Sequence, residues 1–332
     1  QIARKAQGIR RRRMDLELIR TVVREMAPLG LKEIIPTTMG EPLMYKHFPA
    51  IVELCHEHQV KLNLTTNGSF YPLPGGPAGV EGWARLIVPV TVDVKFSWNG
   101  ATEETQQKIM KRSRLSQQLA NLASFIRVRD ELAAAAVAAA SPGEAPHRCR
   151  VTLQLTFMED NLQEIPDIVR LAIAHGCDRV KGHHLWAHFD EIKEQDLRRS
   201  TDSIVRWNAV AAQCRAIVRD SAPHAASGQR LRLENFFDLP LSAAGSGGSS
   251  SPIHPAAVCP FLGREAWLNH AGRFDPCCAP DVQRQLFLGS FGSVAQDGDM
   301  LAVWRSAKYQ QLVKGYAENP LCKGCNMRRP PE

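Results

Sequence analysis

Four cysteines near the C-terminal end of the sequence could together hold a metal centre. Cys259 and Cys277 are separated by seventeen residues, and Cys322 and Cys325 form a C-x-x-C pair. Four thiolates are the full ligand set of a structural zinc ion, and equally of an iron–sulfur cluster. The cysteines alone leave both kinds of centre open, and Cys278, which adjoins Cys277, could replace it as a ligand.

Three polar segments elsewhere in the chain each follow a predicted strand. They are 39–42 (M-G-E-P), 65–68 (T-T-N-G) and 97–100 (S-W-N-G). In a sheet of parallel strands the carboxyl ends lie along one edge, and ligands bind there. A glycine such as Gly40 lets the backbone approach a ligand, and a carboxylate such as Glu41 pairs with an ammonium group. These segments predict a ligand site at that edge.

A fourth strand-end segment carries His183 and His184, and His188 follows after Trp186. Histidines at this position could bind substrate, carry a proton or contact an adenosyl group. They could equally be polar residues of a cavity that Trp186 and Phe189 wall. A metal site is less favoured here, because no carboxylate stands at a firm spacing.

The elements that would position these residues alternate along the chain. Strands are predicted at 31–36, 60–65, 87–96, 151–157, 179–184 and 231–236. Helices are predicted at 14–26, 47–58, 103–126, 162–175 and 200–221. Strands that alternate with helices of this length form βαβ units and a parallel sheet. The fold class is therefore α/β, and four scattered cysteines are expected to pack in its core: Cys55, Cys149, Cys177 and Cys214.

Composition narrows the class of protein. The chain has 332 residues, of which 44% are hydrophobic, and no apolar run approaches the roughly 20 residues that span a bilayer. The net charge is +7, and the one basic run, 10–13, has no interleaved aromatic residues, which argues against nucleic-acid binding. Nine cysteines, an odd number crowded toward one end, favour metal ligation in a reducing cytoplasm over disulfides.

Two low-complexity segments suggest the domain organisation. Residues 133–146 are expected to extend a helix and then loop out, and 241–257 are rich in Gly, Ser and Pro. The second segment is expected to link a first domain at 1–240 to a small cysteine-rich α+β domain at 258–332.

The strand-end segments resemble the radical S-adenosylmethionine (SAM) enzymes. Gly40 and Glu41 match that family's Gly-Gly-Glu-Pro loop, with Met39 in place of the first glycine. The resemblance implies that this loop binds the amino group of the methionine moiety. It implies further cofactor contacts from Asn67, Ser97 and Asn99, the last in place of the usual aspartate. It also implies a partial (β/α)6 barrel, similar to a TIM barrel and clipped at its N-terminus.

The cysteine-rich segment resembles the Twitch and SPASM extensions of the same family. The spacing Cys259-x12-Gly272-x4-Cys277 matches their opening pattern, and 288–289 (L-G) and 303–306 (V-W-R-S) match later elements. The resemblance implies one auxiliary [4Fe–4S] cluster held by Cys259, Cys277, Cys322 and Cys325. A fully ligated cluster of this kind suits electron transfer.

The family's C-x3-C-x2-C motif does not occur in the sequence. The resemblance places it, with a second [4Fe–4S] cluster and the first barrel strand, before Gln1, so the chain as given is expected to be an inactive fragment. For the full-length protein the resemblance implies an oxidoreductase. A 5′-deoxyadenosyl radical would abstract hydrogen from a peptide or small molecule, and flavodoxin or ferredoxin would supply electrons. The alternatives are a non-catalytic electron-transfer or peptide-binding module, and a zinc-stabilised binding protein.

Overall fold

The structure is a computed structural model, and it describes residues 13–36, 40–141, 143, 145–185, 187, 190–245, 257–279, 281–297, 299–323, 325 and 328. The chain forms two compact units. The larger is Lys32–Ser251, and the smaller combines Gln1–Leu31 with Pro252–Glu332. The first helix therefore groups with the C-terminal segment, whereas the sequence placed it in the domain at 1–240. Of the predicted linker, 246–256 lie outside the described residues.

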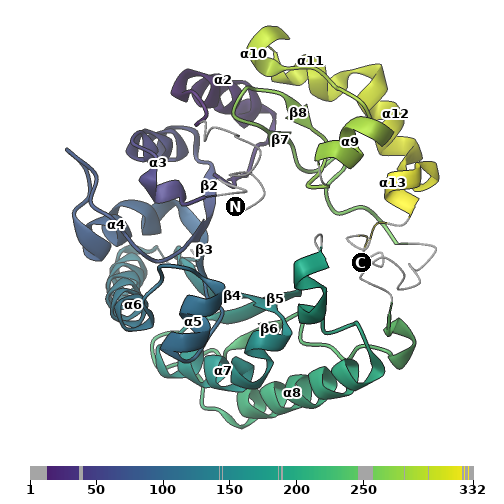
Figure 1. Ribbon diagram of the computed structural model, residues 1–332. Coiled ribbons are helices and arrows are strands. Elements are labelled where there is room, and N and C mark those ends of the chain that lie inside the picture. Colours follow the sequence, from purple (N-terminus) through teal and green to yellow (C-terminus); the bar gives the residue numbers. More distant parts are fainter. Residues whose placement is uncertain are drawn as a thin grey trace. The chain divides into compact units, whose positions relative to one another are not determined.

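The larger unit is built on one parallel sheet, as predicted. Its strands are β1 (Glu33–Ile34), β2 (Lys61–Thr66), β3 (Thr91–Ser97), β4 (Arg150–Phe157), β5 (Arg179–His184) and β6 (Arg232–Glu234), paired in chain order. Its helices are α3 (Phe48–His58), α4 (Gly79–Ile87), α5 (Glu103–Ile109), α6 (Leu115–Ala139), α7 (Ile165–Ala174) and α8 (Thr201–Asp220). Helices lie along one side of the sheet (Figure 1). The carboxyl ends of all six strands therefore share one edge.

Two sequence predictions in this unit were wrong. The helix α4 was not predicted, because it begins at Gly79 without a side-chain cap. The single helix predicted at 103–126 is two helices. The break between them includes Met110, which leaves the helical region, and Arg112, at φ +69°. No glycine or proline marks this break in the sequence.

The two faces of the sheet differ in chemistry. One face is apolar and buried, with Leu62, Leu64, Val94, Phe96 and Leu153 each at 0% exposure. The other carries polar side chains, which we call the polar face: Glu33, Asn63, Asp93, Lys95, Thr152, Arg179, Lys181 and Glu234. Parallel sheets usually bury apolar side chains on both faces. Strict alternation in this sheet therefore indicates that its polar face is built for polar contents.

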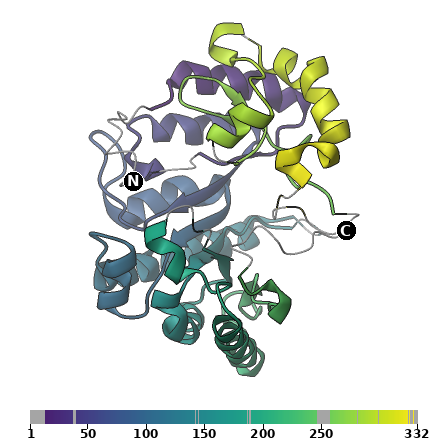
Figure 2. The ribbon, with the colours of Figure 1, turned by 45° about the vertical axis from the view of Figure 1, so that its right-hand side comes forward.

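The smaller unit joins α2 (Leu16–Met26) to a cluster of short elements. These are β7 (Trp267–Leu268), β8 (Phe274–Asp275), α9 (Asp281–Phe287), α10 (Val294–Asp297), α11 (Met300–Arg305), α12 (Ala307–Gly315) and α13 (Pro320–Lys323). Leu18, Val22 and Met26 of α2 pack against a core that includes Phe274 and Tyr309. Figure 2 shows α2 beside these C-terminal helices. The apolar side chains of α2 are thus buried by residues of the C-terminal segment, far away in the sequence.

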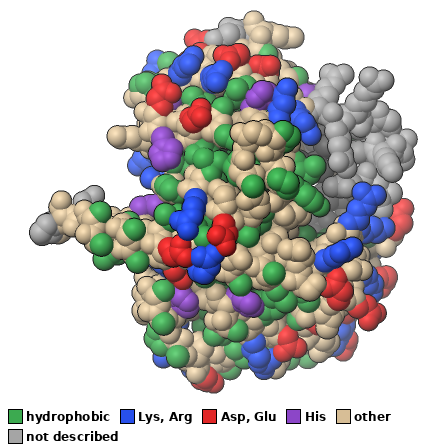
Figure 3. All heavy atoms as spheres, turned by 90° about the vertical axis from the view of Figure 1, so that its left-hand side faces the viewer, with side chains coloured by type: hydrophobic (Ala, Val, Ile, Leu, Met, Phe, Trp, Pro, Cys, Tyr) green, Lys and Arg blue, Asp and Glu red, His purple; other side chains and the backbone are tan. Residues whose placement is uncertain are grey.

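Surface charge is mixed, and no helix in the described ranges is long and apolar enough to cross a membrane. Acidic and basic side chains are interspersed on the face shown in Figure 3. The net charge of +7 is therefore not gathered into one basic patch on that face.

Candidate cofactor-binding site

Glu41 lies at the carboxyl edge of the sheet and contacts the neighbouring strand end. It caps a short 3-10 helix (Pro42–Met44), where the backbone N–H of Leu43 donates to Oε1 at 3.2 Å. Thr66 Oγ1 also donates to Oε1, at 2.9 Å, and the backbone N–H of Asn67 donates to Oε2 at 2.6 Å. Burial raises the pKa of Glu41, and the hydrogen bonds from Asn67, Thr66 and Leu43 oppose that rise. The carboxylate is thus held in place by neutral donors.

Gly40 provides space beside this carboxylate. It has φ +106°, a conformation that favours glycine. Apart from its chain neighbours, no described atom lies within 4 Å of the position that a Cβ would occupy. A ligand can therefore approach the backbone here, next to Glu41, and a ligand ammonium would meet a carboxylate that no described cation pairs. The residues present thus fit the aminoacyl end of SAM.

Asn67 begins a tight turn that keeps this strand end in shape. Its side-chain oxygen accepts from the N–H of Ser69 at 2.9 Å, and Thr66 Oγ1 accepts from the N–H of Gly68 at 3.1 Å. Gly68 has φ +75° and lies against Phe96. The predicted residues Gly40, Glu41 and Asn67 are thus brought together.

Ser97 and Asn99 lie at the next strand end but serve different neighbours. Ser97 is the last residue of β3 and is paired in register with Gln154 of β4. The Asn99 Oδ1 accepts from the backbone N–H of Thr156 at 2.8 Å, and its carbonyl accepts from Asn161 at 3.1 Å. In the described part of the chain no hydrogen bond joins either residue to Glu41. Asn99 therefore shapes the loop, in the role of a turn former.

The polar face adds charged residues that the sequence analysis did not single out. Arg179 donates to Asp93 and Glu234, and Lys181 lies 2.7 Å from Glu234. Lys95 is 9% exposed and donates to Asn63, but it has no carboxylate within ion-pair distance among the described residues. Burial is the main cause that lowers the pKa of Lys95. The sequence did indicate this polar face, because polar residues occupy alternate positions of each strand.

The histidines separate into two environments. His184 is enclosed by Phe157 and Trp207, with ring centroids 5.3 and 4.6 Å away. Burial and the nearby Arg198 guanidinium lower the pKa of His184 to about 3, so the ring is neutral. His183 is exposed and contacts Asn235. His184 thus lies on the apolar side, away from the polar face, while Trp186, His188 and Phe189 lie outside the described residues.

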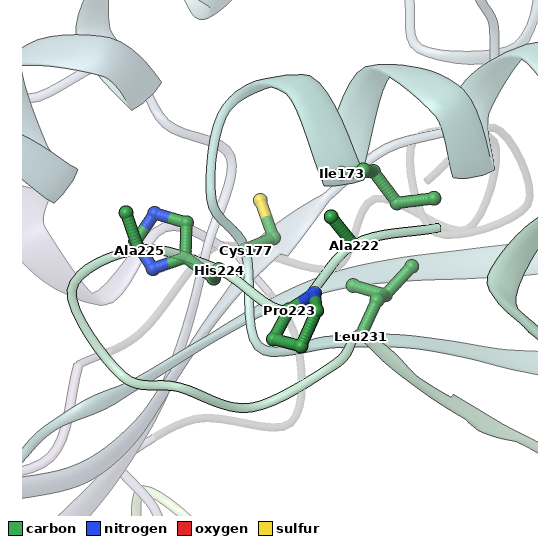
Figure 4. Close-up of a pocket in the computed structure, with 7 residues that line it drawn as sticks. All are labelled: Ile173, Cys177, Ala222, Pro223, His224, Ala225 and Leu231. Atoms are coloured by element: carbon green, nitrogen blue, oxygen red, sulfur yellow. The ribbon is translucent and has the colours of Figure 1, made fainter. Parts of the chain in front are cut away.

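A pocket of about 240 Å³ lies at the opposite edge of the sheet (Figure 4). Cys177 and Leu231 line it, and they precede β5 and β6 in the chain. His224 closes against Gly176 so tightly that a Cβ there would lie 2.1 Å from its Nε2 atom. Because this pocket is at the amino ends of the strands, it is separate from the candidate site.

The cysteines of the smaller unit occupy one neighbourhood. Cys259 and Cys277 pack against the core of that unit. Burial, and after it the neighbouring charges of Cys277, Cys325 and Cys259, raise the pKa of the Cys322 thiol to about 12. The backbone N–H of Leu262 lies 3.5 Å from Cys259 Sγ, a contact suited to a thiolate. The donor chemistry therefore fits an iron–sulfur cluster.

These thiols do not reach the spacing of a single bound ion. Within the described ranges, no three Cys, His, Asp or Glu side chains form a group that could hold a metal ion. Cys278 is exposed, whereas Cys277 is partly buried with the others. The remaining cysteines, Cys55, Cys149, Cys177 and Cys214, are buried in the larger unit, as predicted.

Two family models match the sequence. Residues 2–136 match the radical SAM superfamily, and residues 259–326 match SPASM, an iron–sulfur cluster-binding domain. The second match contains all four predicted ligand cysteines. A search of curated proteins gave no match.

Several solved structures have a similar fold. SuiB from Streptococcus suis bound to S-adenosylmethionine has a TM-score of 0.60 at 14% identity, over 93% of this chain and 64% of that one. SuiB bound to the precursor peptide SuiA gives 0.58 at 15% identity, over 94% and 62%. The protein anSMEcpe with bound AdoMet gives 0.58 at 13% identity, over 95% and 80%. The chain thus spans less than two thirds of SuiB, and at these identities the likeness shows the fold.

Proposed function

We propose that the full-length protein is a radical SAM enzyme that modifies a peptide by hydrogen-atom abstraction, since residues 2–136 match the radical SAM superfamily and residues 259–326 match an iron–sulfur cluster-binding domain. SAM would bind at the carboxyl edge of the sheet. Peptide as the substrate class is supported by SuiB and anSMEcpe, similar folds whose structures contain peptides.

The observation that carries this proposal is the setting of Glu41. Its carboxylate is fixed by Thr66 and Asn67, beside the open approach at Gly40. An ammonium group would form a charge-assisted hydrogen bond there and offset the cost of burying the carboxylate. Gly40, Glu41 and Asn67 would then bind the aminoacyl end of SAM. Ser97 and Asn99, at the end of the next strand, would form the neighbouring wall of the same site.

The polar face would receive the reacting part of the substrate. Its charges are paired across strands, between β5 and β3 and between β5 and β6, so they are held without an apolar core on that side. Lys95 of this face has no carboxylate within ion-pair distance in the described part of the chain, and it donates to the neutral Asn63. A substrate or cofactor carboxylate would supply that partner.

Cys259, Cys277, Cys322 and Cys325 would hold an auxiliary [4Fe–4S] cluster. SAM bound at the sheet edge would supply the hydrogen-abstracting chemistry, and the auxiliary cluster would supply electron transfer. The partly buried thiols would shield such a cluster from solvent, and the Leu262 N–H would stabilise charge on Cys259. A flavodoxin or ferredoxin would deliver the electrons, and net oxidation of the substrate would follow.

The test is anaerobic incubation of full-length protein with SAM and a strong reductant. The expected products are 5′-deoxyadenosine and methionine, formed by a protein that contains iron and acid-labile sulfide. If the protein contains iron and sulfide but does not cleave SAM, the proposal that it is an enzyme is wrong. An electron-transfer or peptide-binding module would then remain. Zinc without sulfide would overturn both centres.

A further inference from the structure

Two buried glutamines connect the loops that follow β2 and β3. Gln118 of α6 donates from Nε2 to the carbonyl of Asn67 at 2.7 Å. Gln106 of α5 accepts at Oε1 from the backbone N–H of Asn99 at 2.9 Å. The two carboxamides are joined by a 2.6 Å hydrogen bond from Gln106 Nε2 to Gln118 Oε1. A continuous chain of hydrogen bonds therefore runs from Asn99 to Asn67.

The burial of these side chains makes the connection rigid. Gln106 is 0% exposed and Gln118 is 4% exposed. Both ends of each carboxamide are used, and Ser113 Oγ donates a further 2.6 Å hydrogen bond to Gln118 Oε1. Rotating either carboxamide would leave buried donors and acceptors without partners, which is unfavourable. Each glutamine is therefore held in one orientation.

The chain of hydrogen bonds extends to the neighbouring strand ends. The N–H of Asn67 donates to Glu41 in the loop after β1, and Asn99 Oδ1 accepts from Thr156 near the end of β4. Asn121, one helical turn after Gln118, donates to the carbonyl of Gly68 at 2.7 Å. Four successive strand ends are thus joined by hydrogen bonds.

A close backbone approach at Gly100 supports a specific fit. A Cβ at this position would lie 2.5 Å from the backbone nitrogen of Gln106. Backbone cannot yield as a flexible side chain does, so the loop after β3 meets α5 at this distance only because residue 100 is glycine. The hydrogen bond between Gln106 and Asn99 therefore depends on the close approach that Gly100 permits.

We propose that Gln106 and Gln118 are positioning residues for the aminoacyl end of SAM. They hold Asn67, and through it Glu41, at a fixed place relative to the loop after β3. The inference rests on the proposed function, because it assumes that Glu41 and Asn67 face the methionine moiety. It predicts that losing the glutamines weakens recognition of that moiety and spares recognition of adenosine.

The experiment compares two ligands on the full-length, cluster-containing protein by anaerobic calorimetry. SAM carries the aminoacyl end, and 5′-methylthioadenosine has the adenosyl part without it. Gln118→Met keeps the size of the side chain and removes its hydrogen bonds. We expect about tenfold weaker SAM binding with 5′-methylthioadenosine binding unchanged. Gln118→Glu, which keeps the acceptor but not the donor to Asn67, should show the same change in ratio. The exposed neighbour Gln107→Met is the matched control and should leave both affinities unchanged.

The outcomes separate this inference from the proposed function. Equal weakening of both ligands, or no change in either, would overturn the positioning role while wild-type SAM binding upheld the site. Failure of the wild type to bind SAM would overturn the proposed function itself. If Gln118→Met does not fold, Gln106→Met decides by the same ratio, because it breaks the link between Gln118 and Asn99 that holds Asn67 relative to the loop after β3.

Discussion

Asn67 donates its backbone N–H to Glu41 Oε2 at 2.6 Å, which joins the segment after β1 to the segment after β2. These residues are 26 positions apart and meet because parallel strands end at one edge. When ionised, this half-buried carboxylate accepts hydrogen bonds only from neutral donors, so its charge is available to a ligand cation. This relationship is the basis of the first two predictions.

Glu41→Gln should weaken SAM binding by roughly ten- to a hundredfold, because a charge-assisted hydrogen bond contributes about 1.5–3 kcal/mol. The glutamine also places an amide group against the Asn67 N–H in one of its orientations. Calorimetry with SAM measures the loss, and the exposed Glu53→Gln on α3 is the control. Unchanged affinity in Glu41→Gln would exclude this carboxylate from the site.

SAM affinity should depend on pH through Glu41. Burial raises the pKa of Glu41 above its usual 4.5, so the carboxylate is protonated at a higher pH than an exposed glutamate. Only the ionised form pairs with an ammonium group, so affinity should be constant at pH values well above the raised pKa and fall as the pH drops through it. A titration of the dissociation constant should show this step in the wild type and not in Glu41→Gln. A step that persists in Glu41→Gln would assign it to another group.

Much of the fold could be predicted from sequence because β-branched runs alternate with helical spacing. The range 179–184 was predicted as observed for β5, and the α8 bounds differ by one residue at each end. The helix α4 and the break after α5 could not be predicted, because they are decided by burial of Trp83 and by the turn at Arg112. The placement of α2 was also hidden, since its apolar face gives no information about which core it contacts.

The candidate site was predictable in part. Gly40, Glu41 and Asn67 could be found because motif letters at strand ends converge at one edge. Gln106 and Gln118 could not, since a glutamine in a helix is usually exposed and only tertiary structure places these two under the loops. Lys95 could have been noticed in the sequence, because it is a charged residue inside a strand. It lies between Val94 and Phe96, so its side chain faces the side of the sheet opposite to theirs.

Asp93→Asn and Lys95→Met should affect stability in opposite ways. Asp93 is 2% exposed and pairs with Arg179, which keeps Glu234 as a second partner, so its loss removes one charge-assisted hydrogen bond and should cost about 1.5–3 kcal/mol of unfolding free energy. Lys95 has no such partner in the described ranges, so methionine there should be neutral or stabilising, while SAM-dependent turnover of the substrate falls. Urea denaturation and turnover assays measure the two effects, and a large loss of stability in Lys95→Met would show that its charge is structural.

The stability of the wild type should also rise with pH through Lys95. Burial lowers the pKa of Lys95 below 10.5, so the unfolded chain binds more protons than the folded one between these two values. Unfolding free energy should therefore increase as the pH rises through that window. Lys95→Met should lack this increase when the two urea-denaturation series are compared, and an identical pH dependence in both would contradict the assignment.

Serine substitutions should identify the cluster ligands. Changing Cys259, Cys277, Cys322 or Cys325 should lower iron and sulfide content, because each would remove one of four thiolates. Cys278→Ser should retain both, since Cys278 is exposed, and Cys214→Ser is the control for a buried cysteine of the larger unit. Loss of iron in Cys278→Ser but not in Cys277→Ser would show that Cys278, and not Cys277, is the cluster ligand.

The C-terminal unit should require the N-terminal helix for stability. Glu25 of α2 accepts at Oε2 from the backbone N–H of Met300 at 3.0 Å, so it caps the start of α11. Leu18, Val22 and Met26 contribute apolar contacts to the same core. Glu25→Ala should cost about 1 kcal/mol, as loss of a helix cap does, and Val22→Asp should cost more because it places a charge against that core. Thermal unfolding, followed through the absorbance of the cluster, measures both losses of stability. Glu17→Ala, at an exposed position of the same helix, is the control. An unchanged unfolding transition in Val22→Asp would show that the unit is stable without α2.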